Sequence, residues 1–197
     1  MITVVIQAGG ASSRMGEDKA LKLFLGRPLI QRVIERLTPI ADELIVTTNR
    51  PAEYAFLNLR LVADLKPGRG ALGGLYTAIA SATHPLVAVV ACDMPFASAK
   101  FFEGAHSLML EKDADVVIAK TDEGYEPFHA LYRRESCLPA IESAIAADQW
   151  KVISWFQKVN VQISNPDEIK SLNPSGLCFW NLNTPAEFLE AERRANE

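Results

Sequence analysis

A loop dense in glycine, hydroxyl and cationic residues directly follows the first apolar run of the sequence. Glycines let backbone N–H groups approach phosphate oxygens, while hydroxyls add donors and cations supply positive charge. Ligands of open α/β sheets bind outside the carboxyl ends of the strands, where this loop would lie. The composition predicts a phosphate site and disfavours a flexible surface connection with incidental charges. The candidate residues are Gly9, Gly10, Ser12, Ser13, Arg14 and Lys19.

A carboxylate stands at the end of a second apolar run. Asp93 follows 86–92 and precedes Pro95, which cannot continue a central strand. A hard cation such as Mg²⁺ is held by one or two carboxylates together with substrate phosphates and waters, so a single aspartate can suffice. Asp93 as the cap of the next helix is the alternative, although Ser98 is better placed for that. We expect Asp93 to face the same sheet edge as the glycine loop, where it could hold Mg²⁺.

Short β-branched runs alternate with longer runs of helical period, which is the pattern of a parallel sheet covered by helices on both faces. This predicts an open, three-layer, Rossmann-like α/β fold that is mostly parallel. The segments 127–133 and 159–163 predict antiparallel additions in the C-terminal part. Thr184, Pro185 and Glu187 form the start signal of a last helix. The predicted strands are 3–6, 43–47, 60–62, 86–91 and 115–119, and the predicted helices are 28–37, 71–82, 98–111, 135–147 and 185–194.

Length and composition indicate one domain of ordinary globular type. The chain has 197 residues and a mass of 21.6 kDa, with 49% hydrophobic and 22% charged residues. This is enough apolar material for one sizeable core. No repeat or long linker divides the sequence, so we interpret residues 1–197 as a single domain.

The net charge and the spacing of the cysteines argue against several classes of function. The formal charge of −4 argues against broad binding to nucleic acid or to an anionic membrane. The apolar runs are far shorter than the roughly 20 residues that cross a bilayer, and the chain starts without a basic leader. Cys92, Cys137 and Cys178 are widely spaced, which disfavours disulfides and a Cys-x-x-Cys metal site. We expect a cytoplasmic protein with reduced thiols.

A second glycine segment, from Gly68 to Gly73, formally satisfies the dinucleotide-binding fingerprint Gly-x-Gly-x-x-Gly. That fingerprint requires a strand to run directly into its glycine turn, whereas residues 65–67 intervene after Asp64. The dinucleotide interpretation would also leave the N-terminal loop without a role. We therefore interpret the segment, including Gly73, as a second backbone wall of the substrate cleft.

Several segments together resemble the MobA-like nucleoside-triphosphate transferases, the family typified by the molybdenum cofactor guanylyltransferases. The family signature Leu-Ala-Gly-Gly-x-Ser-x-Arg-Met-Gly-x-Asp-Lys is matched from Ala8 to Lys19, with Gln7 in place of the leucine. Ala71 stands where the family usually has proline. The resemblance covers almost the whole chain. The other matching segments are Asn49, Asp64, 68–74, 92–95, 127–132 and 181–185.

The resemblance implies the nucleotide-diphospho-sugar transferase type of fold and a Mg²⁺-dependent nucleotidyltransferase. GMP would pass from GTP to the phosphate of molybdopterin, or of its molybdenum-loaded form, with release of pyrophosphate. Asp93 would bind Mg²⁺, and Arg14 and Lys19 would stabilise charge on the triphosphate as catalytic residues. Residues 127–132 would border the acceptor, which other cofactor-biosynthesis proteins could deliver. The implied nucleotide contacts are Gln7, Ala8, Gly9, Lys19, Asn49 and Asp64.

The sequence leaves three alternatives to a guanylyltransferase open. The run from Ala8 to Gly10 favours guanylyl transfer over the related cytidylyltransferases, which usually have Ala-Ala-Gly there. A sugar-phosphate nucleotidyltransferase keeps a similar loop, typically on a longer chain. A non-catalytic nucleotide-binding adaptor is the third alternative, against which the intact Arg14, Lys19 and Asp93 speak. The amide of Asn183 could face a metal-bound water or the acceptor, or the residue could simply form the turn into the last helix.

Overall fold

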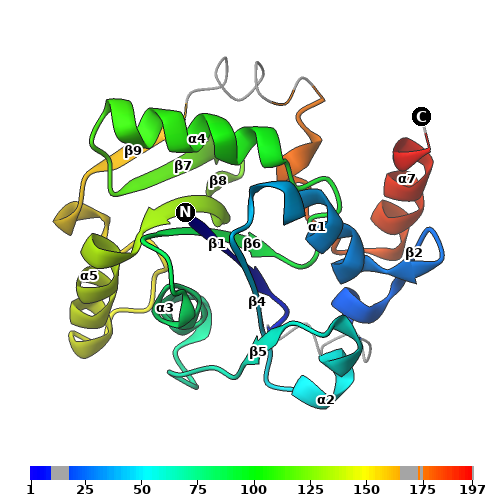
Figure 1. Ribbon diagram of the computed structural model, residues 1–197, viewed down its shortest axis with the longest axis horizontal. Helices are drawn as coiled ribbons and strands as arrows, with labels where there is room; N and C mark the ends of the chain where they lie inside the picture. Colours follow the sequence, from blue (N-terminus) through cyan, green and yellow to red (C-terminus); the bar gives the residue numbers. More distant parts are fainter. Residues whose placement is uncertain (10–17, 165–172, 174, 197) are drawn as a thin grey trace.

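A seven-stranded sheet forms the centre of the computed structural model, which describes residues 1–9, 18–164, 173 and 175–196. Its strands are β1 (Ile2–Gln7), β4 (Glu43–Thr47), β5 (Arg60–Val62), β6 (Leu86–Ala91), β7 (Val116–Thr121), β8 (Gly124–Arg133) and β9 (Val161–Ser164). Their order across the sheet is β5-β4-β1-β6-β8-β7-β9 (Figure 1). The helices are α1 (Leu29–Leu37), α2 (Pro51–Tyr54), α3 (Gly70–Ser81), α4 (Ala99–Glu111), α5 (Arg134–Ala146) and α7 (Pro185–Ala195).

The direction of the strands confirms the predicted mixed sheet. β5, β4, β1 and β6 are mutually parallel neighbours, whereas β8 runs antiparallel to both β6 and β7. β9 pairs parallel with β7 and so shares the direction of β6, which means that 127–133 is antiparallel as predicted whereas the antiparallel prediction for 159–163 is wrong. The chain leaves β1 toward β4 on one side and later adds β6 on the other, so the two loops that follow β1 and β6 open at the point where the strand order reverses. In open α/β sheets this point is the usual ligand crevice.

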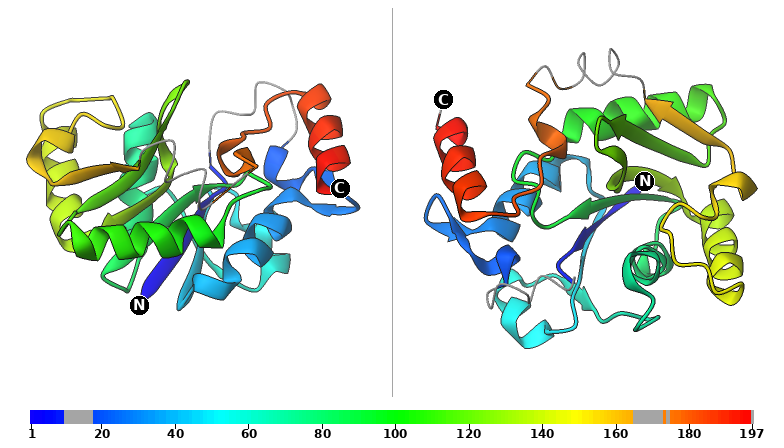
Figure 2. Two further views of the ribbon diagram at one scale, coloured as in Figure 1. Left: turned by 90° about the horizontal axis from the view of Figure 1, so that it is seen from above. Right: turned by 180° about the vertical axis from the view of Figure 1, so that it is seen from behind.

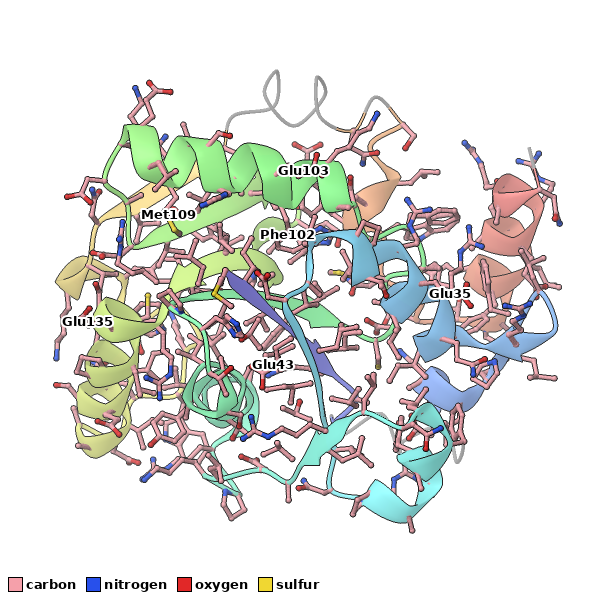
Figure 3. All side chains as sticks on the ribbon, in the orientation of Figure 1. Glu35, Glu43, Phe102, Glu103, Met109 and Glu135 are labelled. Carbon is pink, nitrogen blue, oxygen red and sulfur yellow. The ribbon has the colours of Figure 1, made fainter. Side chains whose placement is uncertain are left out.

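Helices cover both faces of the sheet, which gives three layers (Figure 2). Side chains alternate along β1, so that Val4 and Ile6 pack in one apolar cluster with α1 and α4 while Val5 packs in the other with α3 and α5. On α4, Phe102 and Met109 are buried against the sheet, and Glu103 lies on the exposed side (Figure 3). The predicted helical period therefore corresponds to the observed inner face of α4.

A small lobe beside the sheet was not predicted from the sequence. A hairpin of β2 (Leu23–Phe24) and β3 (Arg27–Pro28) packs against α7, with the rings of Phe24 and Phe188 6.4 Å apart. Strands of two residues carry no readable period, which explains the omission. The start of α7 is as predicted: Thr184 accepts from the backbone N–H of Glu187, whose carboxylate accepts from that of Thr184. Short 3₁₀ helices are η2 (Lys19–Leu21), η3 (Thr38–Ile40), η4 (Ala55–Leu57), η5 (Phe156–Lys158) and η6 (Leu177–Phe179).

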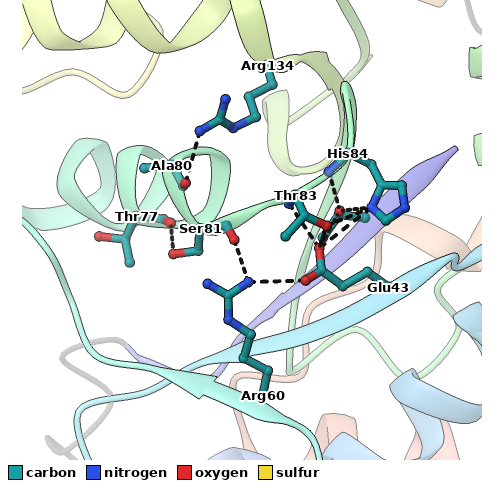
Figure 4. Close-up of polar contacts among 9 residues, drawn as sticks. Glu43, Arg60, Thr77, Ala80, Ser81, Thr83, His84 and Arg134 are labelled. Atoms are coloured by element: carbon teal, nitrogen blue, oxygen red, sulfur yellow. Dashed lines mark hydrogen bonds and ion pairs between the residues drawn. The ribbon is translucent and has the colours of Figure 1, made fainter.

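A carboxylate network secures the amino end of the sheet, where β1 and β4 begin (Figure 4). Glu43 accepts hydrogen bonds from the hydroxyls of Thr3 and Thr83 at 2.7 and 2.8 Å, and from the Arg60 guanidinium at 3.1 Å. Burial opposes ionisation of Glu43, but these hydrogen bonds outweigh it and lower its pKa to about 2. Arg60 also donates to the carbonyl of Ser81 at 2.9 Å, which ties the end of α3 to the network.

Two further observations concern membrane-spanning helices and cysteines. None of the helices in the part of the chain that the structure describes is long and apolar enough to cross a membrane. All three cysteines are free thiols.

Candidate active site

The end of β1 forms the floor of the site. The backbone N–H of Ala8 donates to the carbonyl of Thr47 at 2.9 Å, and that of Cys92 donates to the carbonyl of Gln7 at 3.0 Å. The glycine loop therefore leaves the sheet between the ends of β4 and β6. Ala8 is buried and Gly9 is exposed at this edge. Four of the predicted site residues, Gly10, Ser12, Ser13 and Arg14, lie outside the described residues.

Three side chains from distant parts of the sequence meet above this floor. The Lys19 ammonium lies 3.9 Å from the carboxylate of Asp93 and donates to the side-chain oxygen of Asn183 at 2.8 Å. Asn183 is brought there by its neighbour Leu182, whose N–H donates to the backbone carbonyl of Asp93 at 2.9 Å. Asp93 thus lies at the same sheet edge as Gly9 and Lys19, the described residues on either side of 10–17.

The Asp93 carboxylate and the Lys19 ammonium are both largely shielded from water. The Asp93 side chain is 21% exposed and that of Lys19 is 19% exposed. Burial raises the pKa of Asp93, while the Lys19 ammonium acts in the opposite direction. Among the described residues, no three histidine, cysteine or acidic side chains gather into a metal cage. One carboxylate beside Gly9 and Lys19 nevertheless fits Mg²⁺, which would take its other ligands from phosphates and water.

A polar hollow of about 280 Å³ opens on the β4 side of β1, and we call it the base-side hollow. The side-chain oxygen of Asn49 accepts from the backbone N–H of Asp64 at 2.9 Å, and the hydroxyl of Thr77 donates to the Asp64 carboxylate at 2.8 Å. These contacts hold the two predicted residues in place against α3. The hollow is lined by Gln7, Gly9, Thr47, Thr48, Asn49, Asp64, Gly74 and Thr77.

Two glycines, Gly73 and Gly74, determine how α3 packs beside the base-side hollow. A Cβ at Gly73 would lie 2.7 Å from the carbonyl oxygen of Lys66, so the preceding loop packs directly on its backbone. Gly74 lines the hollow, and its carbonyl accepts from the Gln7 side-chain amide at 2.5 Å. Gln7, the departure from the family leucine, therefore braces β1 against α3. Because residues 63–69 separate β5 from α3, no strand runs directly into the second glycine segment.

Two more hollows continue the cleft past Lys19. The phosphate-side hollow, of about 540 Å³, is lined by Gln7, Ala8, Gly9, Asp18, Lys19, Ala91, Cys92, Asp93 and Phe128. It shares Gln7 and Gly9 with the base-side hollow. The C-terminal hollow, of about 930 Å³, is lined by Thr121, Asp122, Glu123, Glu126, 175–177, Phe179, Trp180, Asn181, Asn183 and Glu187. Since Asn183 bonds to Lys19, the two hollows adjoin.

Several of these residues were missed from the sequence. Thr77 falls on a predicted helix, where one hydroxyl carries no recognisable signal. Trp180 lines the C-terminal hollow with its ring stacked on Phe96, the two centroids being 6.0 Å apart. Asp18 is part of the signature, yet its contacts are visible only in the fold. Of the predicted acceptor-side segment, Phe128 borders the phosphate-side hollow, whereas Ala130 and Tyr132 are buried in the core.

Comparison with known proteins gives consistent likenesses over the whole chain. Residues 4–161 match the family described as "MobA-like NTP transferase domain". The "Molybdenum cofactor guanylyltransferase" of Desulfosudis oleivorans is 33% identical, covering 97% of this chain and 94% of that protein. A "Probable molybdenum cofactor guanylyltransferase" of Carboxydothermus hydrogenoformans is 35% identical, covering 95% and 93%. In fold, the chain resembles "Molybdopterin-guanine dinucleotide biosynthesis protein A" of Archaeoglobus fulgidus, with a TM-score of 0.83, 24% identity and 98% of both chains covered.

Proposed function

Because the chain belongs to the family of MobA-like NTP transferase domains, we propose that it transfers GMP from GTP to molybdopterin or its molybdenum-loaded form. The new bond joins the acceptor phosphate to GMP, so the product is a molybdopterin guanine dinucleotide. The other product is pyrophosphate. A cytoplasmic location agrees with the three free thiols.

The observation that carries the proposal is the meeting of Lys19, Asp93 and Asn183 at the exit of β1. Lys19 and Asp93 are 74 positions apart in sequence, yet their charged atoms are 3.9 Å apart beside Gly9 and the glycine loop. A cation and a carboxylate at this distance provide both attraction for a polyphosphate and a ligand for its counter-ion. The base-side hollow, on one flank, is open to solvent and offers polar groups that a nucleoside could contact.

The chemistry requires alignment and charge neutralisation, and it requires no covalent intermediate on the protein. An oxygen of the acceptor phosphate attacks the α-phosphorus of GTP; a P–O bond forms there as the bond to the bridging oxygen of the β-phosphate breaks. Lys19 neutralises charge on the triphosphate, and the exposed backbone at Gly9 allows close approach of its oxygens. We assign the same work to Arg14, Ser12, Ser13 and Gly10 of the signature.

Asp93 is the residue that would hold Mg²⁺. The bound cation would supply further neutralisation of phosphate charge. Lys19 keeps the Asp93 carboxylate in place through their ion pair, and the backbone contact to Leu182 fixes the adjoining chain. Asp93 is therefore assigned as both a metal and a catalytic residue.

The nucleoside and the acceptor would enter from opposite sides of Lys19. Asn49 and Asp64 line the base-side hollow, where a guanine or ribose could meet their polar atoms. The acceptor would occupy the C-terminal hollow, where Asn183 stands next to the reacting phosphates and Trp180 presents an aromatic edge. In this proposal the acceptor phosphate would point toward Lys19.

The decisive experiment measures pyrophosphate release with GTP, Mg²⁺ and molybdopterin, repeated with CTP. We expect release with GTP, and a loss of at least a hundredfold in the Asp93→Asn variant. Asp42→Asn, at the opposite end of the sheet, is the matched control and should keep wild-type turnover. Preference for CTP would overturn the guanine assignment, release with neither nucleotide would indicate a binding protein, and wild-type turnover in Asp93→Asn would remove its assigned role.

A further inference from the structure

The carboxylate of Asp18 is held by three donors at the end of the glycine loop. The Tyr54 hydroxyl donates to Asp18 Oδ2 at 2.5 Å, and the Arg50 guanidinium forms an ion pair with the same oxygen. The other oxygen, Oδ1, accepts from the backbone N–H of Ala20 at 3.1 Å. The Asp18 side chain is only 8% exposed, so these donors replace the water that it would otherwise bind.

The contact with Ala20 sets the backbone at Lys19. Asp18 is the N-cap of η2, which begins at Lys19, and its side chain accepts from the second N–H of that short helix. Such a cap satisfies a free backbone N–H and so stabilises the backbone at the start of the helix, from which the Lys19 side chain leaves. The Lys19 side chain leaves η2 toward Asp93 and Asn183.

We call the contacts of Arg50 and Tyr54 with the Asp18 carboxylate the clamp. Both residues belong to a segment that also contributes Asn49 to the base-side hollow. Arg50 directly follows Asn49 of the base-side hollow, and Tyr54 is the last residue of α2 and fully buried. The segment from Asn49 to Tyr54 therefore touches the base-side hollow at one end and the start of η2 at the other.

The clamp also offsets the negative charge of the Asp18 carboxylate. Asp18 lines the phosphate-side hollow together with Asp93. An uncompensated carboxylate there would repel a polyphosphate, since two like charges interact strongly where water is partly excluded. The Arg50 guanidinium offsets that charge, and the Tyr54 hydroxyl donates to the same carboxylate oxygen.

We propose that Tyr54 and Arg50 are positioning residues for nucleotidyl transfer: through Asp18 they fix η2 and thereby hold the Lys19 ammonium beside Asp93 and Asn183. The inference rests on the proposed function of the same site. Among the described residues, neither Tyr54 nor Arg50 lines the phosphate-side hollow, whereas Asp18 and Lys19 do, so we assign both an action through Asp18 on Lys19.

Tyr54→Phe removes one hydroxyl and keeps the buried ring. We expect its kcat with GTP and molybdopterin to fall about tenfold or more, because misplaced catalytic groups cost rate even when binding persists. The KM for GTP should rise less than in Lys19→Ala, because the Lys19 ammonium is displaced but still present. Arg50→Gln, in a side chain that is 52% exposed, should also lower kcat. Tyr76→Phe is the matched control, since it removes the hydroxyl that bonds Glu142 at 2.9 Å on the surface, and it should leave kcat unchanged.

A double mutant separates positioning from general stability. If Tyr54 acts through Lys19, Tyr54→Phe should change kcat less than about twofold in a Lys19→Ala background. Multiplicative losses in the double mutant, or a Tyr54→Phe enzyme as active as wild type, would overturn the inference. These outcomes presuppose a wild-type protein that releases pyrophosphate from GTP, whereas a wild type without that activity refutes the proposed function itself.

Discussion

The Glu43 network predicts a measurable acid sensitivity that one substitution should remove. In Glu43→Gln the side chain keeps its size but loses the negative charge that pairs with Arg60 at 3.1 Å. It also loses one of the two oxygens that accept from Thr3, Thr83 and Arg60. The substitution lies at the amino end of the sheet, away from the candidate site, so its effect should be on stability.

The magnitude follows from the pKa of Glu43. Its hydrogen bonds lower the pKa from the ordinary 4.5 to about 2, so the folded state holds the ionised form more strongly than the unfolded chain does. Stability from this source is fully present above pH 4.5 and is lost as the pH falls toward 2. The whole difference corresponds to about 3 kcal/mol, of which about 2 kcal/mol is lost by pH 3. The side chain is only 18% exposed, so solvent screening reduces this little.

Urea unfolding at pH 6 and at pH 3 measures the effect. The fall in unfolding free energy between these pH values should be about 2 kcal/mol smaller in Glu43→Gln than in wild type. Glu35→Gln is the matched control: its carboxylate pairs with Arg27 at 3.0 Å but is 60% exposed, and exposed pairs contribute little. An acid slope in Glu43→Gln as steep as that of wild type would refute the reasoning.

Three further predictions concern the site and its support. Lys19→Ala should raise the KM for GTP about tenfold or more in initial-rate measurements, because the proposed charge-assisted contact of its ammonium with phosphate would be lost; an unchanged GTP dependence would contradict its role. Gly73→Ala should lower the unfolding free energy by about 1–3 kcal/mol in urea titrations, since its Cβ would meet the Lys66 carbonyl at 2.7 Å, and an unchanged midpoint would refute that close packing. Thr184→Ala should cost about 1 kcal/mol in the same titration by breaking the capping box with Glu187, whereas equal stability would show that the cap is dispensable.

The local features of this protein follow from its sequence. The alternation of apolar residues predicts the strands and long helices because side-chain direction repeats every two residues in a strand and about every 3.6 in a helix. The capping box at Thr184 is equally local, since its partners are three residues apart. The signature from Ala8 to Lys19 predicts a phosphate loop because residue types alone determine which donors and charges are available.

Only the tertiary structure decides which of these groups meet. Whether Lys19 reaches Asp93 depends on the neighbouring positions of β1 and β6 in the sheet, and its contact with Asn183 joins residues 164 positions apart. Tyr54 shows no sign of a role in its own sequence neighbourhood, yet its hydroxyl closes the clamp on Asp18. Such contacts depend on strand order and on the packing of α2 beside η2, and both are set by burying the apolar faces of the whole chain together, which no local period encodes.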